Sequence, residues 1–68
     1  MKVQINGREH QLPADATLLH ALEALNIPAD RQGSAIAVKA TVVPRSAWST
    51  HTLEAGDAIE IVTAAQGG

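Results

Sequence analysis

The pair Asn6-Gly7 separates two short segments in which apolar and polar residues alternate. Before it, Val3 and Ile5 alternate with polar residues, which is the period-two pattern of a half-buried strand. Asn-Gly is a strong signal for a two-residue hairpin turn, because both residues accept a positive φ. The segment REHQL then returns as a second strand with Leu12 directed inward. The chain is therefore predicted to open with a β-hairpin.

The next segment, ADATLLHALEALNIP, changes from strand periodicity to helix periodicity. Leucines recur at i, i+4 and i+7 with a fourth beside them, which predicts one apolar helical stripe. These leucines are Leu18, Leu22, Leu25 and Leu19. Thr17 or Asp15 can cap the first free N–H groups, and Pro28 cannot continue a helix. We expect a helix of two to three turns across the apolar face of the hairpin.

Two strand-like segments follow a polar connection. SAIAV places Ile36 and Val38 on one face with only alanines between them, which favours a covered position in a sheet over an edge. Lys39-Ala40 then forms a predicted tight turn into TVVP, a short strand closed by Pro44.

The last part of the chain combines an irregular segment with one more strand. RSAWSTHTL has no clear period, and Trp48 is expected to pack over one end of the core. After the Gly-containing turn EAGD, the segment AIEIV alternates, with Ile59 and Ile61 inward and Glu60 outward.

This order of elements predicts an α+β fold, in which one main helix covers a mixed sheet of four to five strands. If the last strand lies beside the first, the arrangement is a ubiquitin-like β-grasp roll. We expect residues 1–63 to form this domain and residues 64–68 to project as a flexible tail.

Composition excludes several function classes. Without cysteine, disulfides and thiolate metal sites cannot form, and the three histidines lie far apart without ligand spacing, so no metal site is predicted. The net charge is −2 and the five basic residues are scattered, which argues against nucleic-acid binding. No segment has the roughly 18 apolar residues of a membrane span, and the start lacks a signal-peptide pattern. We expect a cytoplasmic protein.

Catalytic groups are also not evident. No nucleophile stands in a recognisable arrangement with a base, and the glycines match no nucleotide-binding fingerprint. The carboxylates fall on predicted turns and exposed faces and are interpreted as solvated surface. They are Glu9, Asp15, Glu23, Asp30, Glu54, Asp57 and Glu60. An independent enzyme with a bound cofactor is therefore not expected.

The ending AAQGG is the remaining candidate for function. Its α-carboxylate is ionised at neutral pH and can attack an activated phosphate when an enzyme surrounds it. Two glycines without Cβ atoms can pass through a narrow channel, and Ala64 and Ala65 keep the approach slim. On residues alone, the tail predicts a carboxylate presented to a partner protein.

Across essentially its whole length, the chain resembles the ThiS-type sulfur carrier proteins of thiamine biosynthesis. The most specific segments are VVPR..W and GD.IEIV...QGG, together with the NG turn and TLLHALEAL. Within that pattern, Pro44 and Trp48 are expected to support the fold. Lys39-Ala40 departs from the resemblance, since relatives often carry a more turn-prone pair there.

The resemblance implies a mechanism for the terminal glycine, Gly68. A ThiF-type enzyme would consume ATP to adenylate its carboxylate. Sulfur mobilised from cysteine by a desulfurase would then replace the adenylate and leave a thiocarboxylate. A ThiG-type thiazole synthase would accept this sulfur, so the chain is expected to be a protein co-substrate and not an enzyme.

Residue roles follow from the same resemblance. Gly68 would carry the sulfur, while Gly67, Gln66 and Ala65 would lie in the channel of a partner. The possible docking surface consists of Val62, Glu60 and Arg45.

Three other functions share parts of this pattern. The small subunit of molybdopterin synthase is also a β-grasp sulfur carrier that ends in two glycines, but VVPR..W and the short length favour the thiamine carrier. A carrier for tRNA thiolation, or one conjugated to lysines, is a further option. A plain β-grasp interaction module would leave the glycines inert.

Overall fold

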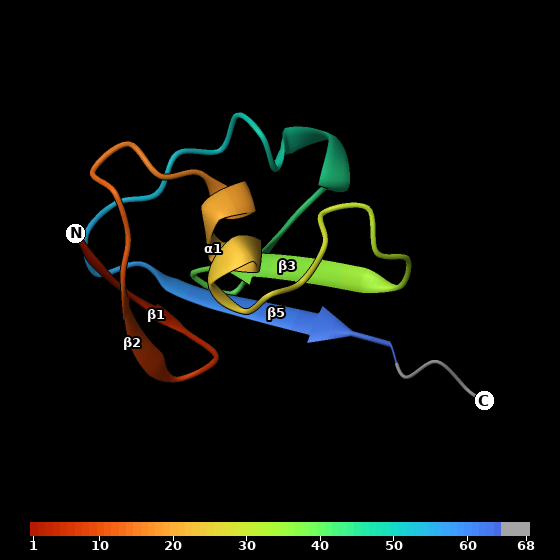
Figure 1. The fold of residues 1–68 in the computed structure, drawn as a ribbon, viewed down its shortest axis with the longest axis horizontal. Coiled ribbons are helices and arrows are strands. Elements are labelled where there is room, and N and C mark those ends of the chain that lie inside the picture. The colour runs from red at the N-terminus through yellow and green to blue at the C-terminus, as the bar shows by residue number, and fades with distance from the viewer. Residues whose placement is uncertain (65–68) are drawn as a thin grey trace.

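The computed structural model describes residues 1–64. In chain order, its elements are β1 (Lys2–Ile5), β2 (Arg8–Gln11), α1 (Leu18–Ala24), β3 (Ser34–Val38), β4 (Thr41–Val43), the 3₁₀ helix η1 (Arg45–Ala47) and β5 (Ala58–Thr63). The strands form one sheet in the order β2-β1-β5-β3-β4, with α1 across one face (Figure 1). β1 and β5 are parallel and the other pairs antiparallel, so the sheet is mixed. This confirms the predicted β-grasp roll and the covered position of β3.

The core lies between α1 and the inner face of the sheet. Its largest fully buried side chains are Ile5, Leu18, Leu22, Ile36, Ile59 and Val3. Each comes from a position that the alternating or helical pattern assigned to the interior, as does the buried Leu12. Leu19 is the exception among the helical leucines, because its side chain remains 36% exposed at the border of the stripe.

The start of α1 is fixed by Thr17, the first of the two predicted caps. Its Oγ1 accepts a hydrogen bond from the Leu19 N–H at 3.3 Å, and its own N–H donates to Nδ1 of His20 at 3.0 Å. This reciprocal pair is a capping box in which histidine takes the place usually held by Glu or Gln. The helix has seven residues, and Asn26 beyond its end adopts a φ of 58°.

Two hairpin turns have positive φ at both central residues. The values are 53° and 83° for Asn6-Gly7, and 51° and 68° for Lys39-Ala40. Both predicted turns are therefore present. The second is unusual because neither Lys nor Ala favours this region, so the surrounding contacts must hold it.

Segment 45–53, predicted to be irregular, begins with η1. Trp48 is 3% exposed, and its Nε1 donates to the Val43 carbonyl at 2.9 Å. The expected packing role of Trp48 is thus confirmed. Pro44 precedes η1 at a φ of −64°, which suits the fixed proline ring.

Candidate functional site

β5 is the middle strand of the sheet, and it is followed by Ala64, the last residue that the structure describes (Figure 1). The predicted site residues Ala65, Gln66, Gly67 and Gly68 lie outside the described residues. The structure therefore defines the base from which they leave, and this base consists of β5 and its neighbours.

The two sides of β5 are paired unequally. Its pairing with β3 runs from Ile59 opposite Val38 to Thr63 opposite Ser34. On the other side, the register with β1 covers only Ala58 and Ile59. β5 therefore loses its β1 neighbour several residues before it ends.

The side chain of Asn6 continues the hydrogen bonding between β1 and β5 by one more residue of β5. Its Oδ1 accepts from the Ile61 N–H at 2.8 Å, and its Nδ2 donates to the Ile61 carbonyl at 3.1 Å. The amide thus supplies the donor and the acceptor of a missing strand residue. Sequence reasoning assigned Asn6 only to the turn, since its partner is 55 positions away.

The exit from β5 is in contact with the loop before β3. The Ala64 N–H donates to the Gly33 carbonyl at 2.9 Å. Ala64 was expected to belong to the free tail, but this bond extends the ordered pairing one residue beyond Thr63. Gly33 has a φ of +80°, and a Cβ placed on it would lie 2.8 Å from the Cβ of Ala64.

The outer face of the sheet, opposite α1, presents small and branched apolar side chains. Val62 lies opposite Ala35, and Ala37 lies opposite Val42, so these residues share one face. We call Ala35, Ala37, Val42 and Val62 the outer apolar patch. Val42 and Val62 are 71% and 61% exposed.

Of the three predicted docking residues, two belong to this face and one does not. Glu60 pairs with Ala37 and borders the patch next to Val62. Arg45 instead lines a hollow with Leu19 of α1, on the helix side. Its guanidinium lies 4.5 Å from the centroid of the Trp48 ring and donates to two carbonyls of the loop before β3.

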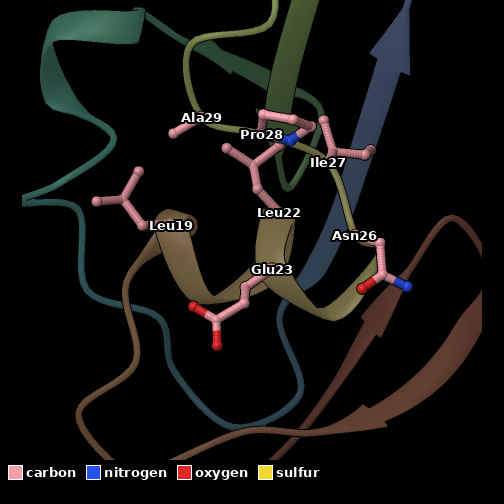
Figure 2. Close-up of a pocket in the computed structure, with 7 residues that line it drawn as sticks. All are labelled: Leu19, Leu22, Glu23, Asn26, Ile27, Pro28 and Ala29. Atoms are coloured by element: carbon pink, nitrogen blue, oxygen red, sulfur yellow. The ribbon is translucent and has the colours of Figure 1, made fainter.

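A shallow hollow on the helix side is lined mainly by aliphatic groups (Figure 2). Its lining is Leu19, Leu22, Glu23, Asn26, Ile27, Pro28 and Ala29. Glu23 is the one ionisable side chain among them, so the hollow offers no acid–base pair. Within residues 1–64, no three metal-binding side chains lie together, and no helix is long and apolar enough to cross a membrane.

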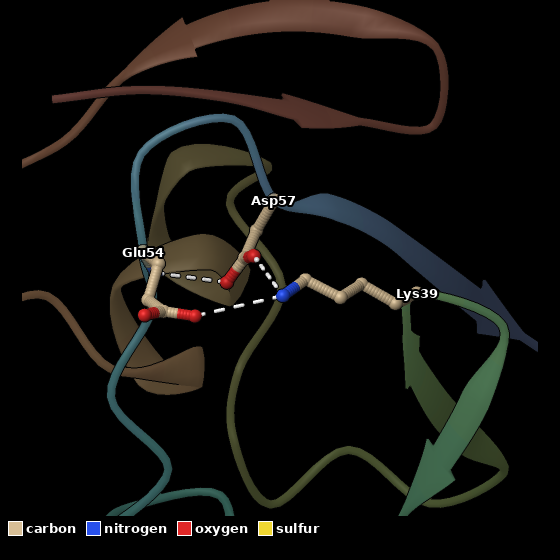
Figure 3. Close-up of polar contacts among 3 residues, drawn as sticks. All are labelled: Lys39, Glu54 and Asp57. Atoms are coloured by element: carbon tan, nitrogen blue, oxygen red, sulfur yellow. Dashed lines mark hydrogen bonds and ion pairs between the residues drawn. The ribbon is translucent and has the colours of Figure 1, made fainter.

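One carboxylate contradicts its interpretation as solvated surface. Asp57 is 4% exposed, and its Oδ2 accepts from the Glu54 N–H at 2.8 Å (Figure 3). Lys39 Nζ lies 3.5 Å from Asp57 Oδ1 and 3.5 Å from Glu54 Oε1. The Asp57 carboxylate, followed by that of Glu54, raises the pKa of Lys39. The cluster thus consists of one cation between two carboxylates, and it closes the turn before β5.

Comparison with known proteins agrees with the architecture. The model of the ThiS family matches residues 3–68. The chain is 33% identical over 69 residues to "Sulfur carrier protein ThiS" of Escherichia coli (strain K12), and the match covers all of both chains.

Two solved structures share the fold. A crystal structure of the thiamine biosynthesis protein ThiS from Geobacter metallireducens matches with a TM-score of 0.77 and 24% identity over the whole of both chains. A solution structure of a thiamine biosynthesis protein from the same organism matches with a TM-score of 0.77 and 23% identity. That match covers all of this chain and 88% of the other.

Proposed function

The chain belongs to the ThiS family, and we propose that this sulfur carrier of thiamine biosynthesis holds its sulfur as a thiocarboxylate on Gly68. The proposal rests on the extent of the family match. It runs to residue 68, four residues beyond Ala64, the last residue that the structure describes. Four residues span at most roughly 13 Å when extended. This length suits a chain end that must enter the active site of another protein.

In the first proposed step, a carboxylate oxygen of Gly68 attacks the α-phosphorus of ATP. An O–P bond forms, pyrophosphate leaves, and the product is an acyl-adenylate. A ThiF-type adenylating enzyme binds the ATP, so the carrier needs no cofactor of its own. The narrow ending Gly67-Gly68 suits this step because it presents no side chain to the channel wall.

In the second proposed step, sulfur at the oxidation level of hydrosulfide attacks the carbonyl carbon of Gly68. A C–S bond forms, and AMP leaves with the electron pair of the C–O bond, so this substitution itself involves no change of oxidation state. A cysteine desulfurase mobilises the sulfur as a persulfide, and a thiol supplies the two electrons that bring it to the hydrosulfide level, with a disulfide as the by-product. A ThiG-type thiazole synthase then accepts the sulfur from the thiocarboxylate. Because these partners depend on ATP and cysteine, we place the reaction in the cytoplasm.

The outer apolar patch is the proposed docking surface for the partners, with Glu60 at its border. Val62 stands two residues before Ala64, so a partner that covers the patch also receives the chain end. Burial of exposed apolar surface favours binding by about 25 cal/mol per Å², from which the cost of association is subtracted. Val62→Asp is expected to raise the KM for the carrier in adenylation without lowering its stability, since the side chain is 61% exposed.

Growth complementation tests the function. A bacterial strain that lacks its own ThiS-type carrier should require added thiazole, and expression of this chain should remove the requirement. The same chain without Gly68 is the matched control and should not restore growth. Restoration by the truncated chain, or failure of the full chain at normal expression, would contradict the proposal. Expression of this chain in a strain that lacks the molybdopterin carrier distinguishes the two carrier types, because a thiamine carrier should not restore molybdopterin synthesis there.

A further inference from the structure

Ala64, the residue after β5, contacts Gly33, the last residue of the loop 29–33 that leads into β3. We propose that Gly33 and Arg45 are positioning residues for sulfur loading, because together they fix where and in which direction the chain leaves the sheet toward Gly68. This inference rests on the proposed function, since only a carrier needs its chain end aimed into a partner.

Gly33 permits a contact that other residues would block. Its carbonyl accepts the Ala64 N–H at 2.9 Å, and the two residues approach so closely that a Cβ on residue 33 would lie 2.8 Å from that of Ala64. Non-bonded carbon atoms pack at about 3.5–4.0 Å. A side chain at position 33 would therefore push Ala64 or the loop away, and the chain would leave β5 from a different point.

Arg45 connects the same loop to the core. Its guanidinium donates to the carbonyls of Ala29 and Arg31, at 2.5 and 2.8 Å, while lying over the ring of Trp48. Trp48 is buried and donates to the Val43 carbonyl. Arginine can hold two carbonyls at once through its planar fork, whereas lysine provides only a single point charge. The loop that contacts Ala64 is thus tied to a rigid part of the molecule.

Only four residues follow Ala64 up to Gly68, so the point at which the chain leaves β5 limits where Gly68 can reach. With roughly 13 Å of chain at most, a displaced exit cannot be fully compensated by the residues that follow. Misplacement of a reacting group by 1 Å can cost about 100-fold in rate. Docking through the outer apolar patch would be unchanged, so the loss is expected in kcat and not in KM.

Three variants separate the steric contact from backbone strain. Gly33→Ala introduces the clash, and Gly33→Ala combined with Ala64→Gly removes the atom that it meets. Gly56→Ala is the matched control: Gly56 has a similar φ of +86°, but a Cβ there meets nothing within 4 Å. Each variant is incubated with a ThiF-type enzyme, ATP and sodium sulfide, and the thiocarboxylate is followed by intact mass. Urea unfolding reports stability.

We expect Gly33→Ala to lower kcat by about tenfold or more with KM within about twofold of wild type. The double variant should recover to within about twofold of Ala64→Gly alone, and Gly56→Ala should load at the wild-type rate even though it loses similar stability. A wild-type kcat for folded Gly33→Ala, no recovery in the double variant, or an equal loss in Gly56→Ala would each overturn the inference.

Arg45→Lys provides an independent test, which also applies if Gly33→Ala does not fold. It keeps the charge but loses one of the two carbonyl contacts, so kcat should fall several-fold while KM is retained. A wild-type kcat in this variant would overturn the role of Arg45. Absence of any mass shift in the wild-type protein, with a partner that loads its own carrier, would instead overturn the proposed function and this inference with it.

Discussion

The two ends of β5 are held in different ways. At its start, Asp57 is buried, its carboxylate caps the preceding turn, and its carbonyl accepts from the Gln4 N–H at 2.9 Å. Lys39 reaches the same carboxylate from the β3–β4 turn. At its end, beyond Ile61, the strand pairs only with β3 and then with Gly33.

This difference indicates a division of roles along one strand. Contacts from three separate parts of the chain meet at the start of β5, so substitutions there should reduce the free energy of unfolding. Few contacts meet at its end, so substitutions there should change sulfur loading more than they change the free energy of unfolding. Stability and presentation of the terminus can then be altered separately.

The largest loss of stability is expected for Asp57→Ala. This change leaves the Glu54 N–H without its acceptor and removes the buried partner of Lys39. Hydrogen bonds to charged groups contribute about 1.5–3 kcal/mol, so we expect a loss of about 2–3 kcal/mol in urea unfolding. Asp57→Asn keeps an oxygen acceptor and should lose less than Asp57→Ala.

The same variants test the division of roles. Folded Asp57→Ala should form the thiocarboxylate at the rate of the wild type, because the exit from β5 is unchanged. A large fall in kcat for molecules shown to be folded would mean that the two ends are coupled.

An intermediate loss is expected for Asn6→Ala. The variant loses both hydrogen bonds to Ile61 and places alanine at a φ of 53°. Two neutral hydrogen bonds at about 0.5–1.5 kcal/mol each predict a loss of about 1–3 kcal/mol. Asn6→Gly is the control, since it accepts the positive φ and removes only the side-chain bonds. Hydrogen exchange of the Ile61 amide should become faster in both variants. Unchanged protection of this amide would show that the Asn6 side chain does not hold β5.

The smallest effect is expected for the ion pairs of Lys39. Because the folded protein raises the pKa of Lys39, the ion pairs contribute stability that is complete below the unfolded value of about 10.4 and is lost as the pH rises through the higher folded value. The wild type should therefore be more stable than Lys39→Gln at pH 8, and the difference should shrink above roughly pH 10.4. Urea unfolding at low salt measures it. A difference that grows with pH would contradict this sign.

Local patterns were sufficient to predict most of the fold. Asn6-Gly7 between alternating segments indicates the first hairpin, and the alanine-spaced Ile36 and Val38 indicate a covered strand. The stripe of leucines predicted that the helix packs on the sheet. In each case, neighbouring residues in the sequence carry the signal, because strand and helix periods are local properties.

The errors concern side chains whose partners are distant or unusual. Asp57 was assigned to solvent because it falls in a predicted Gly-containing turn, whereas it is buried and its ion-pair partner Lys39 comes from another turn. His20 was considered only as a metal ligand, although its position three residues after Thr17 is that of a capping-box acceptor. The docking role of Arg45 stays a prediction; what the sequence did not indicate is its contacts with two loop carbonyls.

The central claim is that Gly68 carries the sulfur and that the domain presents it. Its most direct test compares the wild type with a variant that lacks Gly68, each incubated with a ThiF-type enzyme, ATP and sodium sulfide. We predict that the wild type gains the mass of one oxygen replaced by sulfur, localised to Gly68 by fragmentation. The variant should unfold at the same urea concentration and gain no sulfur. Sulfur on another residue of the wild type, or equal loading of the variant, would contradict the account.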